Sequence, residues 1–195
     1  MPRQARVERA TSETRIELDL SLDGDGTSKV ATGVGFFDHM LTAFARHGLF
    51  DLQLKCQGDL EVDAHHTVED VGICLGQAIA TAVGDKQGLQ RFGHAYVPMD
   101  DALARAVVDL SGRSYLVMDP VLQAGQVGEL PVALVPEFFR SVTDHGRLNL
   151  HIDLLRSLND HHGIEAIFKA FGRALDQATM QSDRVSGVPS TKGTL

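Results

Sequence analysis

Residues 64–83 read AHHTVEDVGICLGQAIATAV, and they join a His-His-x-x-Glu motif to apolar residues at helical spacing. Residues 160–179 read DHHGIEAIFKAFGRALDQAT and repeat both features. The first histidines of the two motifs, His65 and His161, are 161 − 65 = 96 residues apart, which is about half of the 195-residue chain. A motif and a helix that recur together at this interval predict an internal duplication.

The segments that precede the two motifs correspond as well. Alternating apolar residues predict a strand before each motif, and 65 − 52 = 161 − 148 = 13 residues separate the start of each strand pattern from its motif. Farther upstream, each half shows a short helix and, before it, two strands that we expect to form a hairpin. The expected strands are 14–22, 29–32, 52–56, 102–110, 115–118 and 148–154, and the expected upstream helices are 36–45 and 136–142.

This order of elements predicts an α+β fold of two tandem-duplicated halves. We expect the halves to be residues 1–90 and 91–185, followed by a C-terminal tail of residues 186–195. Each half is expected to be a mainly β-sheet layer covered by helices, and the two halves are expected to pack as a sandwich.

The composition is that of an ordinary soluble protein, with 43% hydrophobic and 23% charged residues. No apolar run approaches the roughly 20 residues of a membrane span, and the N-terminus shows no signal-peptide core, so we expect a cytoplasmic protein without a membrane partner. A net charge of −8 argues against non-specific binding to nucleic acid. Cys56 and Cys74 are too few for a disulfide framework and are expected in the core.

The spacing within each motif favours metal binding. On a helix, residues four apart share a face, whereas neighbours point about 100° apart. His65 and Glu69 can therefore bind one ion together, and the same holds for the first histidine and the glutamate of the second motif. The second histidines, His66 and His162, face elsewhere and must serve another ion or none. Imidazole and carboxylate ligands favour Mn²⁺, Fe²⁺ or Zn²⁺, and the missing thiolates argue against structural zinc.

A complete metal site needs further ligands. His151 lies on the polar face of the expected strand 148–154, and His39 lies in the expected helix 36–45, where Asp38 is available to orient it. Spacing alone does not choose between these histidines. A helix N-terminus would by itself favour the glutamates of the motifs, but it gives no reason for paired histidines.

Further motifs occur in a fixed order along the chain. They are FFDHM at 36–40, DAHHTVED at 63–70, DLSGR at 109–113, NDHH at 159–162 with Glu165 and FKA at 168–170, and PSTKG at 189–193. Together they resemble the imidazoleglycerol-phosphate dehydratase family over nearly the whole chain. The resemblance implies a carbon–oxygen lyase of histidine biosynthesis that converts imidazole glycerol phosphate to imidazole acetol phosphate.

The resemblance also implies a dinuclear Mn²⁺ centre with three histidines and one glutamate on each ion. One ion would take His39, His66, His161 and Glu165, and the other would take His65, Glu69, His151 and His162. Members of the family form homo-oligomers of 24 subunits that share active sites, and the same is expected here.

The implied chemistry begins with the imidazole ring bound as an imidazolate between the two ions. Electrons from the ring then help to expel a hydroxyl group through a diazafulvene-like intermediate. The resemblance assigns proton transfer to Glu13, which otherwise reads as a surface residue at the start of a strand. It implies that the tail covers the substrate and that the phosphate is bound by Arg91, Arg113, Lys169, Ser190 and Lys192.

Two other functions are compatible with the metal motifs. A dinuclear metallohydrolase would attack a phosphate ester with a water molecule held between two metals, although such sites usually depend on Asp and bridging carboxylates. A metal-storage or metal-sensing protein would bind the ions without catalysis. A search for a ketone product or for free phosphate separates the three.

Overall fold

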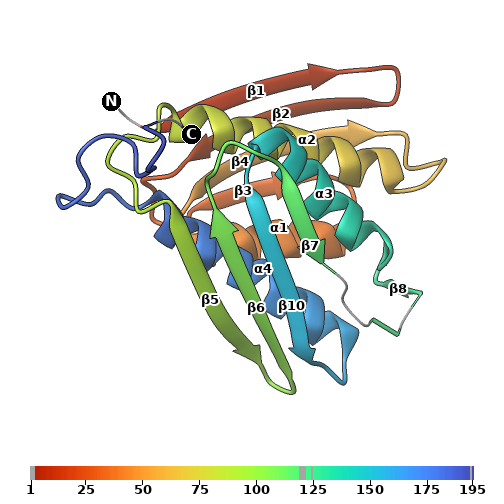
Figure 1. Cartoon of the computed structure of the whole chain (residues 1–195). Coiled ribbons are helices and arrows are strands. Elements are labelled where there is room, and N and C mark those ends of the chain that lie inside the picture. Colours follow the sequence, from red (N-terminus) through yellow and green to blue (C-terminus); the bar gives the residue numbers. More distant parts are fainter. Residues whose placement is uncertain (1–2, 119–121, 124, 194) are drawn as a thin grey trace.

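Two four-stranded sheets, each accompanied by two helices, make up the protein in the computed structural model (Figure 1). The structure describes residues 3–118, 122–123, 125–193 and 195. The first half contains β1 (Gln4–Ala10), β2 (Thr14–Ser21), β3 (Ser28–Ala31), α1 (Gly35–Gly48), β4 (Asp51–Gly58) and α2 (His65–Val83). The second half contains β5 (Phe92–Met99), β6 (Ala102–Asp109), β7 (Tyr115–Met118), the small strands β8 (Gln126–Val127) and β9 (Leu130–Pro131), α3 (Leu134–Gly146), β10 (Asn149–Arg156) and α4 (Asp160–Thr179). The predicted α+β fold of two duplicated halves is confirmed.

The strand order is the same in the two sheets, β1-β2-β4-β3 and β5-β6-β10-β7. The expected hairpins between 14–22 and 29–32 and between 102–110 and 115–118 are therefore wrong, because β4 or β10 lies between the two strands. β3 runs parallel to β4, and β7 runs parallel to β10. The intervening helices α1 and α3 provide the crossover that parallel pairing requires. The actual hairpins join β1 to β2 and β5 to β6.

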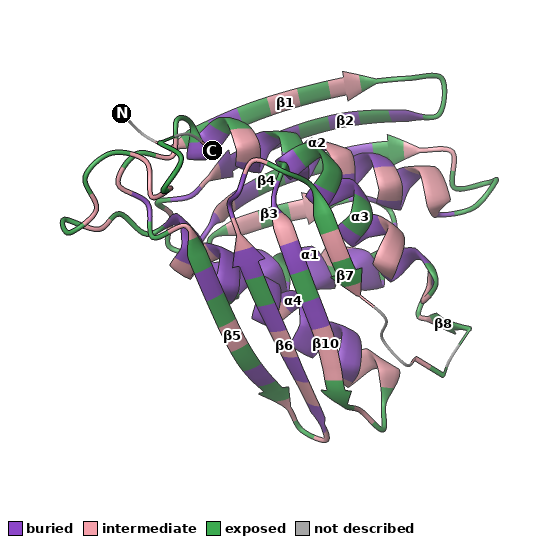
Figure 2. Ribbon diagram, in the orientation of Figure 1, coloured by how far each residue is buried: buried purple, intermediate pink, exposed green. Residues whose placement is uncertain are grey.

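All four helices lie between the two sheets, so the buried sides of strands and helices face the middle of the molecule (Figures 1 and 2). The helix α2 packs against β1 and β2 on one side and against α3 of the other half on its other side. In the same way α4 packs against β5, β6 and α1. The two halves therefore share one core.

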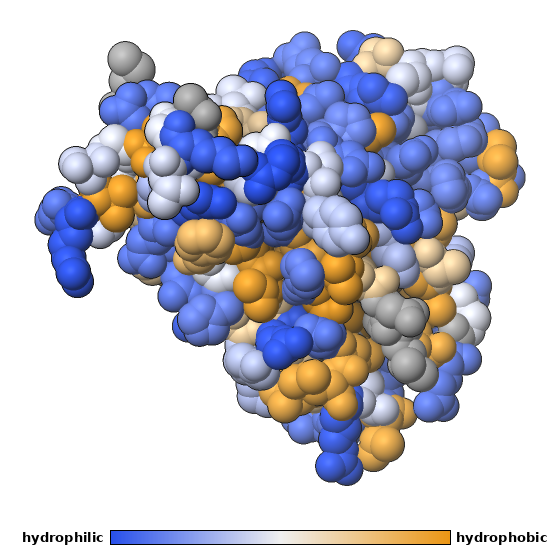
Figure 3. All heavy atoms as spheres, in the orientation of Figure 1, coloured by the Kyte–Doolittle hydropathy of each residue, from blue (hydrophilic) through white to orange (hydrophobic). Residues whose placement is uncertain are grey.

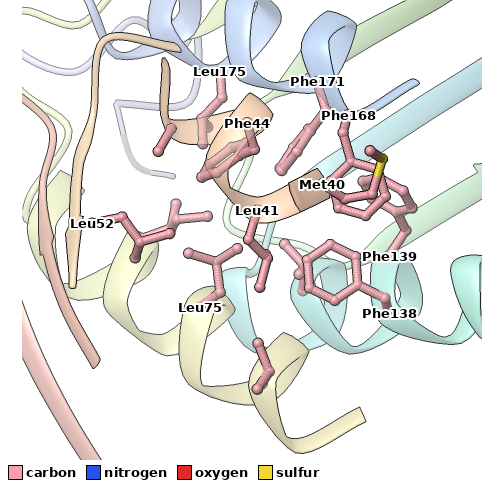
Figure 4. Packing of buried hydrophobic residues seen from close by; sticks show 14 of the residues in the cluster. Met40, Leu41, Phe44, Leu52, Leu75, Phe138, Phe139, Phe168, Phe171 and Leu175 are labelled. Atoms are coloured by element: carbon pink, nitrogen blue, oxygen red, sulfur yellow. The ribbon is translucent and has the colours of Figure 1, made fainter. Parts of the chain in front are cut away.

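Aromatic rings from both halves fill the centre of this core (Figure 4). Phe44 of α1 stacks on Phe171 of α4 with ring centroids 5.2 Å apart, and Phe138 of α3 stacks on Phe168 of α4 at 5.3 Å. Such aromatic pairs each add about 0.5–1.5 kcal/mol beyond the area that they bury. The contact between the halves is thus part of the stability of each half.

The two cysteines are buried, as the sequence predicts. Cys56 and Cys74 are free thiols in the core, and burial raises their pKa values to about 11 and about 12. Among the described residues, no helix combines the length and the apolar character that crossing a membrane requires.

Two glycines at equivalent positions, Gly76 and Gly172, let the helices of the two halves approach closely. A Cβ atom on Gly172 would lie 2.5 Å from the carbonyl oxygen of Phe44 in α1, and one on Gly76 would lie 2.6 Å from that of Val142 in α3. We expect Gly172→Ala to lower the free energy of unfolding by about 1–3 kcal/mol, the usual cost of overpacking a core. Denaturant unfolding measures this, and Gly125→Ala, where the added methyl group meets open space, is the control. An unchanged Gly172→Ala variant would show that the helices move apart at little cost.

Candidate metal centre

Each His-His-x-x-Glu motif forms the first turn of a helix. A side-chain oxygen two residues before the first histidine accepts its backbone N–H, at 2.7 Å in α2 and 2.9 Å in α4. These hydrogen bonds satisfy donors that a helix N-terminus leaves open. The rings of His65 and His66 lie at 90° to each other, and those of His161 and His162 lie at 77°. Neighbouring histidines therefore face different directions.

Three of the predicted ligands from the two halves come together in one group. His39 projects from α1, and His161 and Glu165 project from the first two turns of α4. The Nε2 atoms of His39 and His161 lie 3.5 Å and 3.3 Å from Oε2 of Glu165. All three ligand atoms lie within 4.8 Å of one another, and no other such trio was found in the part of the chain that the structure describes. Two imidazoles and a carboxylate suit a borderline divalent metal.

Glu165 is the buried member of this group, with 8% of its side chain exposed. Burial raises its pKa, but the hydrogen bond from Lys169 and the nearby His39 outweigh burial, so the pKa lies below its ordinary value. The Nζ atom of Lys169 lies 2.6 Å from Oε1 of Glu165. The other carboxylate oxygen of Glu165, Oε2, faces His39 and His161. Glu165 is thus held as an anion, the form that binds a cation.

The first motif forms a second group on an exposed part of the surface. His65 Nε2 lies 4.0 Å from Oε2 of Glu69, as expected for residues on one helix face. His66 Nε2 lies 3.7 Å from Oε1 of Glu13, the carboxylate of the turn between β1 and β2. The structure thus brings Glu13 next to a predicted ligand from a distant part of the sequence.

Two aspartates that the sequence analysis does not identify orient the second histidines. His66 Nδ1 lies 3.0 Å from a carboxylate oxygen of Asp59, and His162 Nδ1 lies 2.6 Å from one of Asp101. These contacts raise the pKa values of both histidines, and the bond with His162 helps to lower that of Asp101 to about 2. When Nδ1 donates to a carboxylate, Nε2 is left free for a metal ion, an arrangement common among metal-binding histidines.

Asp101 also accepts the backbone N–H groups of Leu158 and Asn159, so it holds the loop before α4. We expect Asp101→Asn to weaken metal binding about 10–100-fold, because an amide neither fixes the His162 tautomer nor supplies the negative charge. Competition with a chelator, followed by metal analysis, measures the change. Asp19→Asn on the outer face of the first sheet is the control. Equal affinities for the two variants would mean that Asp101 does not act on the metal centre.

His151 lies apart from these groups, on the outer face of the second sheet. In β10 it pairs with Val107 of β6 and Val117 of β7, and its side chain is exposed. Exposed Tyr96 and Tyr115 lie on the same sheet, and apolar side chains gather over it in Figure 3. One chain therefore does not bring His151 to the other members of its predicted set.

Arg91 ties the C-terminal tail to the second sheet. Its Nε and Nη2 atoms donate to Asp109 at 2.7 Å and 3.1 Å, and Nη1 donates to the carbonyl oxygen of Pro189 at 2.9 Å. The next residue, Ser190, accepts the backbone N–H of Lys192 with its hydroxyl oxygen at 3.2 Å. The structure thus places three of the five predicted phosphate-binding residues along one connected segment.

Two predicted phosphate residues, Arg91 and Arg113, and the start of α4 with His161 belong to opposite ends of the second sheet, whose strands are labelled in Figure 1. Arg113 is exposed at the end where β10 begins, and its carbonyl oxygen accepts a hydrogen bond from Asn149 at 2.6 Å. The eight residues of β10 then lead to the other end, close to His161. At about 3.4 Å per residue, the strand separates the two ends by roughly 25 Å. Lys169, beside Glu165, is the one predicted phosphate residue at the metal end.

Comparison with known proteins shows the family of the chain. The family model for imidazoleglycerol-phosphate dehydratase matches residues 32–175. The imidazoleglycerol-phosphate dehydratase of Acetivibrio thermocellus is 56% identical over 195 residues and covers 100% of both chains. That of Salinibacter ruber is 59% identical over 194 residues, covering 100% of this chain and 96% of the relative.

Two solved structures have the same fold. The crystal structure of the dehydratase from Staphylococcus aureus has a TM-score of 0.83 and 44% identity, covering 92% of this chain and 99% of that one. The Pyrococcus furiosus enzyme in complex with (S)-C348 has a TM-score of 0.83 and 38% identity, covering 97% and 100%. On this agreement of sequence and fold, the chain belongs to the imidazoleglycerol-phosphate dehydratase family and is a dehydratase of histidine biosynthesis.

Proposed function

We propose that this dehydratase binds the imidazole ring of imidazole glycerol phosphate at a dinuclear Mn²⁺ centre completed by residues from several subunits. The observation that carries the proposal is the convergence of His39, His161 and Glu165, which would give one ion three ligands from a single chain. The donor set fits Mn²⁺, since imidazole and carboxylate both bind it.

The remaining ligands of the proposal are those that the resemblance to the dehydratase family implies. His66 is proposed as the fourth ligand of the ion at His39, His161 and Glu165. The second ion is proposed to bind His65, Glu69, His151 and His162. Because His151 lies on the outer face of the second sheet, that apolar face is the surface that we propose to meet a neighbouring subunit.

The separation between the two ends of the second sheet supports shared active sites. A substrate of this size does not bridge roughly 25 Å, so the phosphate residues of one subunit would serve a metal centre at another. Arg91, Arg113, Ser190 and Lys192 are proposed to bind the phosphate, joined by Lys169 from the metal end. We propose that the tail 186–195 closes over the substrate, and that the hydrogen bond from Arg91 to Pro189 anchors it.

The dehydration removes a proton from one carbon and a hydroxyl group from its neighbour. Two bound Mn²⁺ ions would hold the imidazole ring and favour its anionic form. Electrons from the ring would then help to expel the hydroxyl group, by way of the diazafulvene-like intermediate that the resemblance implies. Glu13, held beside His66, is proposed to give a proton to the departing hydroxyl group, so that water leaves, and to take the proton from the adjacent carbon, which forms an enol. The enol becomes the ketone when its hydroxyl proton moves to carbon.

The test is an assay of purified, Mn-loaded protein with imidazole glycerol phosphate. We expect the enolisable ketone imidazole acetol phosphate as the product. Free phosphate without ketone would instead indicate a metallohydrolase, and neither product would indicate metal storage or sensing. We also propose that the enzyme acts in the cytoplasm, with residues 1–90, 91–185 and 186–195 forming one catalytic unit.

The proposed assembly has 24 subunits, and ligands shared between subunits would make it depend on metal. We expect chelation to convert large particles into smaller ones, and added Mn²⁺ to restore them. Sedimentation velocity with and without chelator measures the change. Particles of one size under both conditions would contradict metal ligands that join subunits.

A further inference from the structure

The turn that carries Glu13 is held from below by a buried carboxylate. Asp70 of α2 is 4% exposed, and its two oxygens contact the two strands on either side of the turn 11–13. Oδ1 lies 2.9 Å from Nη2 of Arg9 in β1, and Oδ2 accepts a hydrogen bond from the hydroxyl group of Thr14 in β2. We call Asp70, Arg9 and Thr14 the Asp70 clamp.

The turn above the clamp is also fixed by its own backbone. The hydroxyl oxygen of Thr11 accepts the N–H groups of Glu13 at 3.1 Å and Thr14 at 3.0 Å. The carbonyl oxygen of Glu13 accepts the N–H group of Asp59 at 3.1 Å. Asp59 is also the residue that orients His66, so the Glu13 backbone and this predicted ligand share one anchor. These hydrogen bonds fix the backbone from which the Glu13 side chain extends toward His66.

The second half of the chain shows that the fold itself does not require the clamp. Its hairpin and helix have Val97, Ala102 and Ala166 at the equivalent positions. Ala102 begins β6 as Thr14 begins β2, and Val97 pairs with the third residue of β6 as Arg9 pairs with the third residue of β2. Ala166 follows the first histidine of its motif by five residues, as Asp70 does. All three are buried apolar residues. In the second half, the hairpin thus packs on its helix with buried apolar residues at these positions, whereas the first half has a buried ion pair there. Burying a charge is costly even when it is paired, so the charge of Asp70 below the Glu13 turn is better explained by function than by stability.

We propose that the Asp70 clamp positions Glu13 for proton transfer. The inference rests on the proposed role of Glu13 in the dehydration. The clamp joins the turn to the same helix that carries His65, His66 and Glu69, so the proton carrier and these predicted ligands move as one body. Positioning of this kind matters because a displacement of about 1 Å at a reacting group costs up to about 100-fold in rate.

The test removes one hydroxyl group and leaves the shape of the site unchanged. Thr14→Val should lower kcat about 10–100-fold, because Glu13 loses its position. KM and metal content should change little, because no proposed metal ligand or phosphate-binding residue is altered. Thr14→Ser restores the hydroxyl donor and should recover most of the lost turnover. Thr27→Val is the control, since the Thr27 hydroxyl group also donates to an aspartate, Asp25, at the opposite end of this sheet.

A double mutant separates positioning from general stability. In a Glu13→Gln background, Thr14→Val should cause no further loss of the residual turnover, because the clamp acts through Glu13. A further loss of the same size in that background would overturn the proposal, and so would an unchanged kcat in Thr14→Val. If the Thr14→Val protein does not fold, Asp70→Asn, which removes the charge and preserves the shape, takes its place in the same cycle. If Glu13→Gln alone keeps full turnover, the proposed role of Glu13 fails; if only Thr14→Val is without effect, the clamp fails alone.

Discussion

Glu13→Gln should lower kcat by a factor of about 10²–10⁴, the usual contribution of a group that transfers protons. The amide has the size of the carboxylate but does not act as a general acid or base. The substrate should therefore still bind, and the reaction should stop at the proton transfer. Metal content should be unchanged, because Glu13 is not among the proposed ligands. Steady-state kinetics, metal analysis and a direct measurement of substrate binding test the three statements.

Glu17→Gln is the matched control for this experiment. Glu17 lies in β2, the strand that follows the turn of Glu13, and its side chain is exposed on the outer face of the sheet. The turnover of the Glu17→Gln variant should equal that of the unmodified enzyme. A Glu13→Gln variant with the same turnover as Glu17→Gln would remove Glu13 from the mechanism.

Glu165→Gln should abolish stable metal binding at one of the two sites and reduce turnover by at least about 100-fold. The substitution removes the one anion of the trio, and it leaves Lys169, whose side chain is 15% exposed, without its ion partner at 2.6 Å. Some loss of stability should accompany the loss of metal, because truncating one partner of a buried pair strands the other charge. Metal content per subunit and thermal unfolding with and without Mn²⁺ measure the two effects.

The control for Glu165→Gln is the same substitution at Glu137. Glu137 forms an exposed pair with Arg140 on α3, with side chains that are 42% and 58% exposed, and such pairs contribute little. Glu137→Gln should therefore keep metal, stability and turnover. If Glu165→Gln binds as much metal as Glu137→Gln, the trio is not the metal site.

The doubled motif is sufficient to predict the two halves and the helices that follow each motif, because helix periodicity is a local property of the sequence. It does not predict the order of strands. β4 inserts beside β2 only after α1 has intervened, and such non-local pairing leaves no mark in the spacing of residues. β1 is not predicted either, since Ala5 is its one buried residue and four of its seven residues are charged or polar.

The same limit applies to the site. The i, i+4 spacing predicts that His65 and Glu69 share a face, and helix geometry predicts that His66 points elsewhere. The orienting contact from Asp101 to His162 crosses 162 − 101 = 61 residues, and nothing in the local sequence distinguishes Asp101 from other turn aspartates. The proposed sharing of ligands between subunits would account for His151, which lies apart from the other predicted ligands in a single chain.

The two helix contacts between the halves, α2 on α3 and α1 on α4, are the same contact made twice. Identical half-length chains related by a two-fold axis would make both contacts at once, as in a symmetric homodimer. In one polypeptide, the two copies need not carry the same residues. One hairpin has Ala102 at a buried apolar position, whereas the other has Thr14 hydrogen-bonded to the buried carboxylate of Asp70.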